Sequence, residues 1–328
     1  MRFQRKESYL LSNLRKALPD HKSKLYGGAW SVHDVELVEK RNQFLNEFAD
    51  IDLSSKKSVQ DIKSEFFKVY KDWMFADFDF KGTELYTECC YTQGTTESFA
   101  QFYLRYGGKH RLRLAKGEYF YHQMMKNLWY LDNFEWLEND VIRAGDVVLI
   151  SVPFSDSGSV PEYLEQMLCD CDNLQVPVML DFAYINLTNK DALNHKIDLT
   201  HNCIEYVVSS LSKAFPTEYY RIGIRLQKVK FEDQLYVINE DNYNYLNFCS
   251  MYVGLRMMQT FTAKYMFDKY RPLQLELCEQ LDLQPSPCYI FGIDNKNLYP
   301  QYSRGNNTNR LCFSRIWDGR VNTEELEE

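Results

Sequence analysis

The sequence predicts an α/β fold in which a mostly parallel sheet lies between helices, and three observations support this. First, short apolar runs alternate with longer segments of helical periodicity from residue 85 to 226. Second, the chain has 328 residues, which is enough for two domains or one large α/β unit. Third, polar residues directly follow the apolar runs. In a parallel sheet, functional groups gather at these carboxyl ends of the strands.

Composition and charge argue against several functional classes. The net charge is −8 and the pI is about 5.4, so we expect no nucleic-acid partner. No run of about eighteen apolar residues is present, so we expect no membrane span. The N-terminal segment is too charged for a signal peptide, and the nine cysteines show no disulfide or zinc spacing. We therefore expect a cytoplasmic protein without a bound metal.

The N-terminal part of the chain predicts helices and one glycine-containing loop. Residues 1–20 have the pattern of a short basic amphipathic helix, which we interpret as an arm. Residues 24–30 form a loop in which Gly28 permits a positive φ or a close backbone approach. Residues 33–50 and 57–76 have helical periodicity with mixed charges.

The stretch 91–104 predicts a turn followed by a helix. Gly94 supplies the turn, and Thr95 or Thr96 can cap the start of the helix. A helix N-terminus is also a site where an anion can bind. The next strand leads into a second helix that carries Tyr119 and His122. An aromatic face such as that of Tyr119 can stack on a planar ring, although both residues could equally pack in the core.

Two buried strands then end in polar residues. The first covers the apolar part of 146–158 and leads to Ser155; the second ends at Asp181, followed by Tyr184. A helix over 161–175 connects them. A carboxylate at the end of an apolar strand is unfavourable unless it is paired, so Asp181 predicts a cationic partner.

The stretch 205–226 carries the most informative pattern. An apolar strand is followed by Ser210, Ser212, Lys213 and Arg221, and a second apolar strand begins there. A lysine can form a Schiff base with a carbonyl, an arginine can hold a phosphate through two bonds, and serine hydroxyls can donate to the same phosphate. Alternatively, the lysine lies on the solvated surface.

Beyond residue 226, residues 241–284 predict one long helix or a broken pair, and two strands follow. Arg310 lies on the second of these strands and could form a forked pair with a carboxylate. Arg304, Arg315 and Arg320 are rival candidates for that role.

The order of these motifs resembles fold-type I pyridoxal-phosphate (PLP) enzymes, the aspartate-aminotransferase-like superfamily that includes the class I/II aminotransferases. The motifs are G-T-T-E, an aromatic residue, P-x-S-x-S-G, D-x-A-Y, S-x-S-K and R-x-G, and the resemblance covers about residues 90–226. It implies a fold-type I PLP transferase with a large domain and a smaller α+β domain. We expect 1–80 to form an N-terminal arm and part of the small domain, 81–235 the large PLP-binding domain, and 236–328 the C-terminal small domain.

The resemblance also implies roles for individual residues. Lys213 would carry PLP as an internal aldimine and act as the proton-transfer group, with Asp181 against the pyridine nitrogen and Tyr184 near the phenolic oxygen. Tyr119 would stack on the ring, with His122 behind Asp181, and Arg310 and Gly28 would contact the substrate. The residues expected at the phosphate are Gly94, Thr95, Thr96, Ser210, Ser212 and Arg221. Ser155 replaces the asparagine that usually binds the phenolic oxygen, and Ser155 itself or Asp156 could take over that bond.

The function implied is a PLP-dependent aminotransferase acting on an α-amino acid and a keto acid, in a homodimer with the site at the subunit interface. The Ser155 departure and the short chain also allow a PLP-dependent lyase, decarboxylase or tailoring enzyme of specialised metabolism. A third hypothesis is a non-catalytic homologue on the same scaffold.

Overall fold

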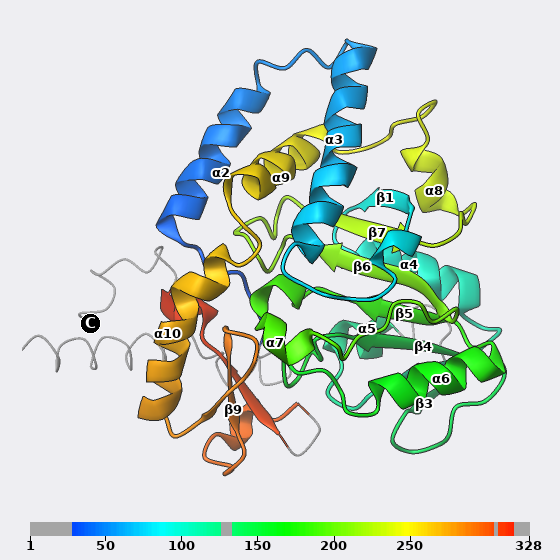
Figure 1. The fold of residues 1–328 in the computed structure, drawn as a ribbon, viewed down its shortest axis with the longest axis vertical. Helices are drawn as coiled ribbons and strands as arrows, with labels where there is room; N and C mark the ends of the chain where they lie inside the picture. The colour runs from blue at the N-terminus through cyan, green and yellow to red at the C-terminus, as the bar shows by residue number, and fades with distance from the viewer. Residues whose placement is uncertain (1–27, 126–132, 305–307, 318–328) are drawn as a thin grey trace, which may run out of the picture.

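The protein contains a seven-stranded sheet with helices on both faces (Figure 1). The computed structural model describes residues 28–125, 133–304 and 308–317. The strands of this sheet are β1 (Glu88–Thr92), β2 (Arg111–Leu114), β3 (Phe134–Trp136), β4 (Asp146–Ser151), β5 (Val178–Asp181), β6 (Ile204–Ser210) and β7 (Gly223–Gln227). Their order across the sheet is β1-β7-β6-β5-β4-β2-β3.

The sheet is mostly parallel, as the sequence predicts. Strand β7 pairs antiparallel with both of its neighbours, β1 and β6, so β1 runs in the same direction as β6. The other pairs, from β6 across to β3, are parallel. The carboxyl ends of β1, β4, β5 and β6 therefore lie at one edge of the sheet, where functional side chains can meet.

Helices account for most of the remaining regular structure. The α-helices are α2 (Val35–Phe48), α3 (Lys56–Phe75), α4 (Thr95–Tyr106), α5 (Phe120–Met125), α6 (Leu164–Leu174), α7 (Lys190–Leu193), α8 (Gln234–Asn239), α9 (Phe248–Thr260) and α10 (Tyr265–Gln280). Short 3₁₀ turns are η2 (Thr83–Leu85), η3 (Ile185–Leu187), η4 (Pro300–Tyr302) and η5 (Ser314–Trp317). The helices predicted over 33–50, 57–76 and 161–175 are α2, α3 and α6, and the segment 241–284 is a broken pair, α9 and α10. The helix predicted over 1–20 lies outside the described residues.

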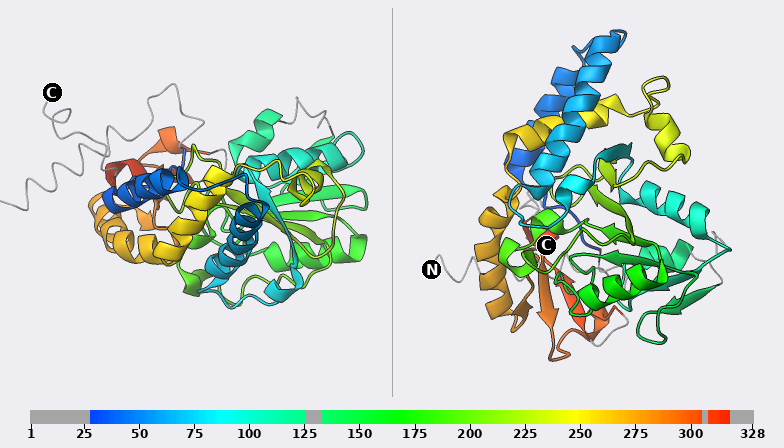
Figure 2. Two further views of the ribbon diagram at one scale, coloured as in Figure 1. Left: turned by 90° about the horizontal axis from the view of Figure 1, so that it is seen from above. Right: turned by 45° about the vertical axis from the view of Figure 1, so that its right-hand side comes forward.

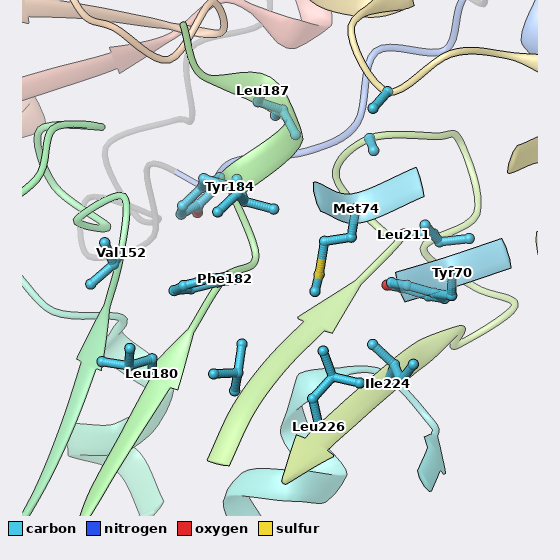
Figure 3. Close-up of a cluster of buried hydrophobic side chains, with 14 of the residues drawn as sticks. Tyr70, Met74, Val152, Leu180, Phe182, Tyr184, Leu187, Leu211, Ile224 and Leu226 are labelled. Carbon is cyan, nitrogen blue, oxygen red and sulfur yellow. The ribbon is translucent and has the colours of Figure 1, made fainter. Parts of the chain in front are cut away.

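Side chains on β4 alternate between two apolar cores because successive strand residues point to opposite faces. Val148 and Ile150 belong to the larger core, which includes residues of α3, α6 and α9. Val147 and Leu149 belong to a second core with residues of α4. Figure 3 shows part of the larger core, where side chains of α3 lie over those of the central strands. Both faces are covered, which explains why the central strands are apolar throughout.

Helices α2 and α3 begin at side-chain caps and pack with α9. The carboxylate of Asp34 accepts hydrogen bonds from the backbone N–H groups of Glu36 and Leu37, and Ser55 caps α3 in the same way. Figure 2 shows α2, α3 and α9 side by side, although α9 comes much later in the sequence than the other two helices. Among the described residues, no helix combines the length and apolar character needed to span a bilayer.

The C-terminal part contains a second, three-stranded antiparallel sheet next to α10. Its strands are β8 (Gln284–Pro285), β9 (Phe291–Asp294) and β10 (Asn309–Cys312). A third apolar core joins α10 to this sheet. The segment falls within the predicted small domain, whose exact boundaries stay a prediction.

Candidate active site

A cavity of about 430 Å³ opens at the edge of the large sheet where the parallel strands end. Of the residues to which the resemblance assigns a role, all line it except Gly94, His122 and the alternative Asp156. The lining residues are Gly28, Ala29, Trp30, Thr95, Thr96, Tyr119, Phe120, Ser155, Asp181, Ala183, Tyr184, Ser210, Ser212, Lys213, Glu218, Tyr219, Arg221, Arg304 and Arg310. The volume lies within the range of about 300–1,000 Å³ that is usual for small-molecule sites.

One end of the cavity is the start of helix α4. Gly94 occupies the N-cap position with φ 74°, and no side chain caps this helix, so the predicted cap by Thr95 or Thr96 is wrong. Both threonines lie in the first turn instead, because the turn needs a residue with positive φ just before the helix. Arg221 Nη2 donates to Thr96 Oγ1 at 2.7 Å and to the Gln93 carbonyl at 3.0 Å. Backbone N–H groups without a side-chain cap, together with a guanidinium, suit an anion.

The connection between β6 and β7 brings hydroxyl groups to the same end. The Oγ atoms of Ser210 and Ser212 lie 2.9 Å apart, and the Ser212 N–H donates to Ser210 Oγ at 3.1 Å. Arg221, at the end of this connection, has φ 56°, and its carbonyl accepts a bond from the Tyr91 hydroxyl at 3.0 Å. Both flanking strands fix these groups, so the hydroxyls and the guanidinium are held by rigid elements.

Lys213 lies in the middle of the cavity, just beyond β6. Its Nζ donates to the Ala29 carbonyl and lies 5.9 Å from the centre of the Trp30 ring. Burial lowers the pKa of Lys213 to about 8, with Arg310 and Arg221 acting in the same direction. A substantial fraction of the amine is therefore neutral near physiological pH, as a nucleophile requires.

Asp181 ends β5, the strand next to β6, and only 4% of its surface is exposed. Its Oδ1 accepts a bond from the Ala183 N–H at 3.1 Å. Burial and the charge of Glu118 raise the pKa of Asp181 to about 8. A cation placed next to this carboxyl group would ionise it, because an opposite charge offsets the cost of burial.

Glu118 is a buried carboxylate that no sequence pattern singles out. It accepts bonds from the Ser151 N–H at 2.6 Å, from the Ser151 hydroxyl and from the Tyr119 N–H at 2.7 Å. Burial raises its pKa in spite of these bonds. Glu118 thus fixes the end of β4 and the start of α5, and its charge acts on Asp181.

Tyr119 and His122 lie together, but only Tyr119 reaches the cavity. Tyr119 is 41% exposed and meets the His122 ring edge-on, with centroids 5.7 Å apart. His122 is fully buried and forms a hydrogen bond through Nδ1 with the Tyr103 hydroxyl. Burial lowers the pKa of His122 to about 3, so its ring is neutral. Among the described residues, its Nε2 has no hydrogen-bond partner.

Two arginines enter the cavity from the C-terminal segment. The guanidinium of Arg310 donates to the Ser155 carbonyl and lies 4.2 Å from the centre of the Phe291 ring. Arg304 Nε lies 3.3 Å from Asp156 Oδ1, and its Nη2 lies 3.4 Å from Ser155 Oγ. Burial, together with the charge of Arg310, lowers the pKa of Arg304 to about 10. The structure therefore brings two of the rival arginines to one wall.

The remaining candidates are Arg315, Arg320 and Tyr184. Arg315 lies over Trp30 at 5.2 Å from the ring centre, and Arg320 lies outside the described residues. Tyr184 faces the Phe291 ring edge at 5.4 Å, and burial raises its pKa to about 12. Its hydroxyl therefore stays protonated at neutral pH and can donate a hydrogen bond.

An N-terminal segment closes the cavity above Lys213. Ser31 donates to Glu218 Oε2 at 2.8 Å, and His33 Nε2 pairs with Glu218 Oε1. These buried contacts hold Gly28, Ala29 and Trp30 against the cavity. No sequence pattern predicts the contacts, because the partners lie more than 180 residues apart along the chain.

Comparison with known proteins identifies the fold. No family model and no curated protein matches the sequence. Among solved structures, the chain is similar to tyrosine aminotransferase from Leishmania infantum (TM-score 0.64, 9% identity, covering 92% of this chain and 90% of that chain). It is also similar to a tetra mutant of Thermus thermophilus aspartate aminotransferase (TM-score 0.59, 12% identity, 91% and 92% covered). A third similar structure is a PLP-bound C-S lyase from Staphylococcus hominis (TM-score 0.55, 10% identity, 81% and 75% covered).

These similarities confirm the predicted α/β fold, which the chain shares with these aminotransferases and this C-S lyase. At sequence identities of 9–12%, these similarities establish only a shared fold. The similar structures include both aminotransferases and a lyase. Function therefore has to be argued from the cavity.

Proposed function

We propose that this chain is a PLP-dependent aminotransferase that acts on an α-amino acid. The observation that carries this proposal is the meeting of Lys213 and Asp181 in one cavity. Asp181 is buried and Lys213 is half-buried, they lie at or just beyond the ends of adjacent parallel strands, and the pKa of each is shifted to about 8. Buried ionisable groups with shifted pKa values in a cavity are typical of catalytic sites.

The described residues fit the groups of PLP. The start of α4 with Thr95, Thr96 and Arg221, together with the two serine hydroxyls after β6, offers an anion site for the phosphate. Asp181, whose buried carboxyl group lacks a full countercharge, suits the ring nitrogen. The exposed face of Tyr119 offers a surface for the ring.

When bound, the cofactor supplies an electron-accepting ring that stabilises negative charge at the substrate Cα. Asp181 keeps that ring protonated at its nitrogen. Lys213 Nζ, with its pKa near 8, is suited both to accept and to return a proton at Cα. Arg310 holds the α-carboxylate, and Tyr184, which stays protonated, donates to an oxygen acceptor in the cavity.

A lyase or related PLP reaction is the second candidate, and Ser155 is the observation that favours it. A hydroxyl on a short side chain stands where the family usually has an asparagine. Here Arg304 Nη2 lies 3.4 Å from Ser155 Oγ, so a guanidinium contributes to the same wall. A hydroxyl and a guanidinium in place of the asparagine amide would change the balance between amino-group transfer and elimination.

The deciding experiment incubates the purified, PLP-loaded protein with a panel of amino acids and keto acids, followed by mass spectrometry of the products. Amino-group exchange between the two pools supports the aminotransferase, and elimination or decarboxylation products support the second candidate. Borohydride reduction should fix the cofactor on the peptide that carries Lys213, and Lys213→Ala is the control. If no adduct forms on the loaded wild-type protein, the proposal fails and a non-catalytic role remains.

The family resemblance further supports a homodimer and a cytoplasmic location, and both stay proposals. The rim of the cavity carries Tyr219, which is 77% exposed. A second subunit that covers this rim would complete the cavity.

A further inference from the structure

A second group of reactive side chains lies at the opposite edge of the sheet from the cavity. Glu165 and Cys169 lie one turn apart on helix α6, and His201 lies in the turn that leads into β6. This turn is at the amino end of β6, whereas the cavity is at the carboxyl end. In Figure 1, α6 lies along the lower right of the sheet, away from α10 and β9.

The ligand atoms of these three residues are spaced as metal ligands are. His201 Nε2 lies 3.3 Å from Glu165 Oε1, and Cys169 Sγ lies 3.9 Å from the same oxygen. All three atoms lie within 4.8 Å of one another. Bonds of about 2.0–2.3 Å in a tetrahedral zinc site separate its ligand atoms by about 3.3–3.6 Å. Small movements of the side chains of Cys169 and of Glu165, which is 61% exposed, would bring the set into that range.

Asp172 holds the histidine ring in the orientation that a metal ligand requires. Its Oδ2 lies 2.7 Å from His201 Nδ1, and its Oδ1 accepts the Cys203 N–H at 2.6 Å. A carboxylate on one ring nitrogen directs the other nitrogen, here Nε2, towards Glu165 and Cys169 with its lone pair available.

A competing set shares His201 but uses its other nitrogen. Asp172, His201 Nδ1 and Cys203 are also close together. However, the Cys203 thiol is buried and donates to the Leu168 carbonyl at 3.5 Å, and burial raises the pKa of that thiol. Asp172 already accepts two hydrogen bonds. The set that uses Nε2, formed by Glu165, Cys169 and His201, is the more accessible one. Fewer hydrogen bonds have to break before a metal ion can bind there.

We propose that Glu165, Cys169 and His201 bind a divalent transition-metal ion of the zinc type, with water as the fourth ligand. Binding forms a metal–thiolate bond at Cys169 Sγ and releases the thiol proton to solvent. The bound ion links helix α6 to the start of β6 and so stabilises the amino edge of the sheet.

Cobalt(II) titration of the cofactor-loaded protein tests this site. Tetrahedral cobalt with a thiolate ligand has intense visible d–d absorption, and we expect it to saturate at one ion per chain. Cys169→Ser should abolish the thiolate-dependent absorption, whereas Cys249→Ser and Cys203→Ser should retain it. Asp172→Asn should weaken binding by about 10- to 100-fold, because the ring loses its orienting partner.

A second readout is thermal. Zinc should raise the unfolding midpoint of the wild-type protein and of Cys249→Ser, but not of Cys169→Ser. Absence of saturable binding would leave a metal-free ion-pair cluster and overturn the proposal. Loss of the signal in Cys203→Ser with retention in Cys169→Ser would overturn it in favour of the competing set. Neither readout uses catalysis, so this outcome is independent of the proposed function.

Discussion

Lys213 and Asp181 show how burial alone can prepare a site for chemistry. In water an amine and a carboxyl group would both be charged at neutral pH, whereas here both pKa values lie at about 8. The two groups carry opposite charges, yet desolvation is the largest contribution for each of them. The site therefore holds a more neutral amine and a more neutral acid than exposed side chains would provide.

The lowered pKa of Lys213 predicts the pH dependence of its reaction with an aldehyde. The neutral amine is the nucleophile, so the rate of PLP attachment to cofactor-free protein should rise with pH through a midpoint of about 8. Stopped-flow absorbance measures this rate, and Lys213→Ala gives the background. A midpoint near 10.5, the usual lysine value, would show that the amine is hydrated rather than buried.

We expect the Arg310→Lys variant to lose recognition of the substrate but not of the cofactor. Lysine keeps the charge but cannot form the forked pair with a carboxylate, so kcat/KM should fall by about ten- to more than a hundredfold. Cofactor affinity should stay unchanged, since the phosphate is assigned to the other end of the cavity. Arg315→Lys, which alters an arginine stacked on Trp30, is the matched control. A larger fall in kcat/KM for Arg304→Lys than for Arg310→Lys would show that Arg304, rather than Arg310, binds the substrate carboxylate.

Some residues of the cavity could be found from sequence and others could not. Lys213 and Arg221 belong to one short connection between two strands, so their spacing along the chain reflects their spacing in space. Glu118 and Glu218 have no such local pattern, because their environment is created by residues far away in the sequence. Burial of a carboxylate is decided by tertiary packing, which one sequence does not display.

At the scale of elements, the turn before α4 is constrained by backbone and side chain together. Gly94 has φ 74°, and a β-carbon there would lie 2.6 Å from Arg221 Nη2. Gly94→Ala should therefore displace the guanidinium and weaken PLP binding by about tenfold or more, measured by equilibrium titration of cofactor-free protein.

Gly108→Ala is the matched control for that variant. Gly108 also has φ 74°, but a β-carbon there would have no atom within 4 Å. Gly108→Ala should also introduce strain from a positive φ, of about 1 kcal/mol, but without loss of cofactor affinity. Equal losses of affinity in both variants would assign the effect to backbone strain rather than to Arg221.

Sequence periodicity predicted most elements but not how they end. The helices of 241–284 separate at residues 261–264, a stretch without glycine or proline, while Pro272 lies inside α10 where a break would be expected. The two-residue strand β8 carries no pattern of its own. In each case contacts with the rest of the fold override the local preference of the chain.

At the scale of the whole molecule, the proposed dimer gives a direct prediction. Sedimentation equilibrium should give twice the chain mass of 39.0 kDa at micromolar concentration. Tyr219→Asp should shift the equilibrium towards the monomer, because a charge would replace an exposed aromatic side chain at the cavity rim. A monomeric wild-type protein at all concentrations would contradict the proposed dimer.

The segment above Lys213 also has a consequence for the order of events during synthesis. The cavity needs Ala29 from near the beginning of the described chain and Arg310 from near its end. A ribosome-bound chain that has not yet released residue 310 lacks a complete cavity, however well its central strands have paired. On the proposed assignment of Arg310, the substrate carboxylate can therefore bind only after residue 310 has left the ribosome, and the early folding steps proceed without the stabilisation that a bound substrate gives.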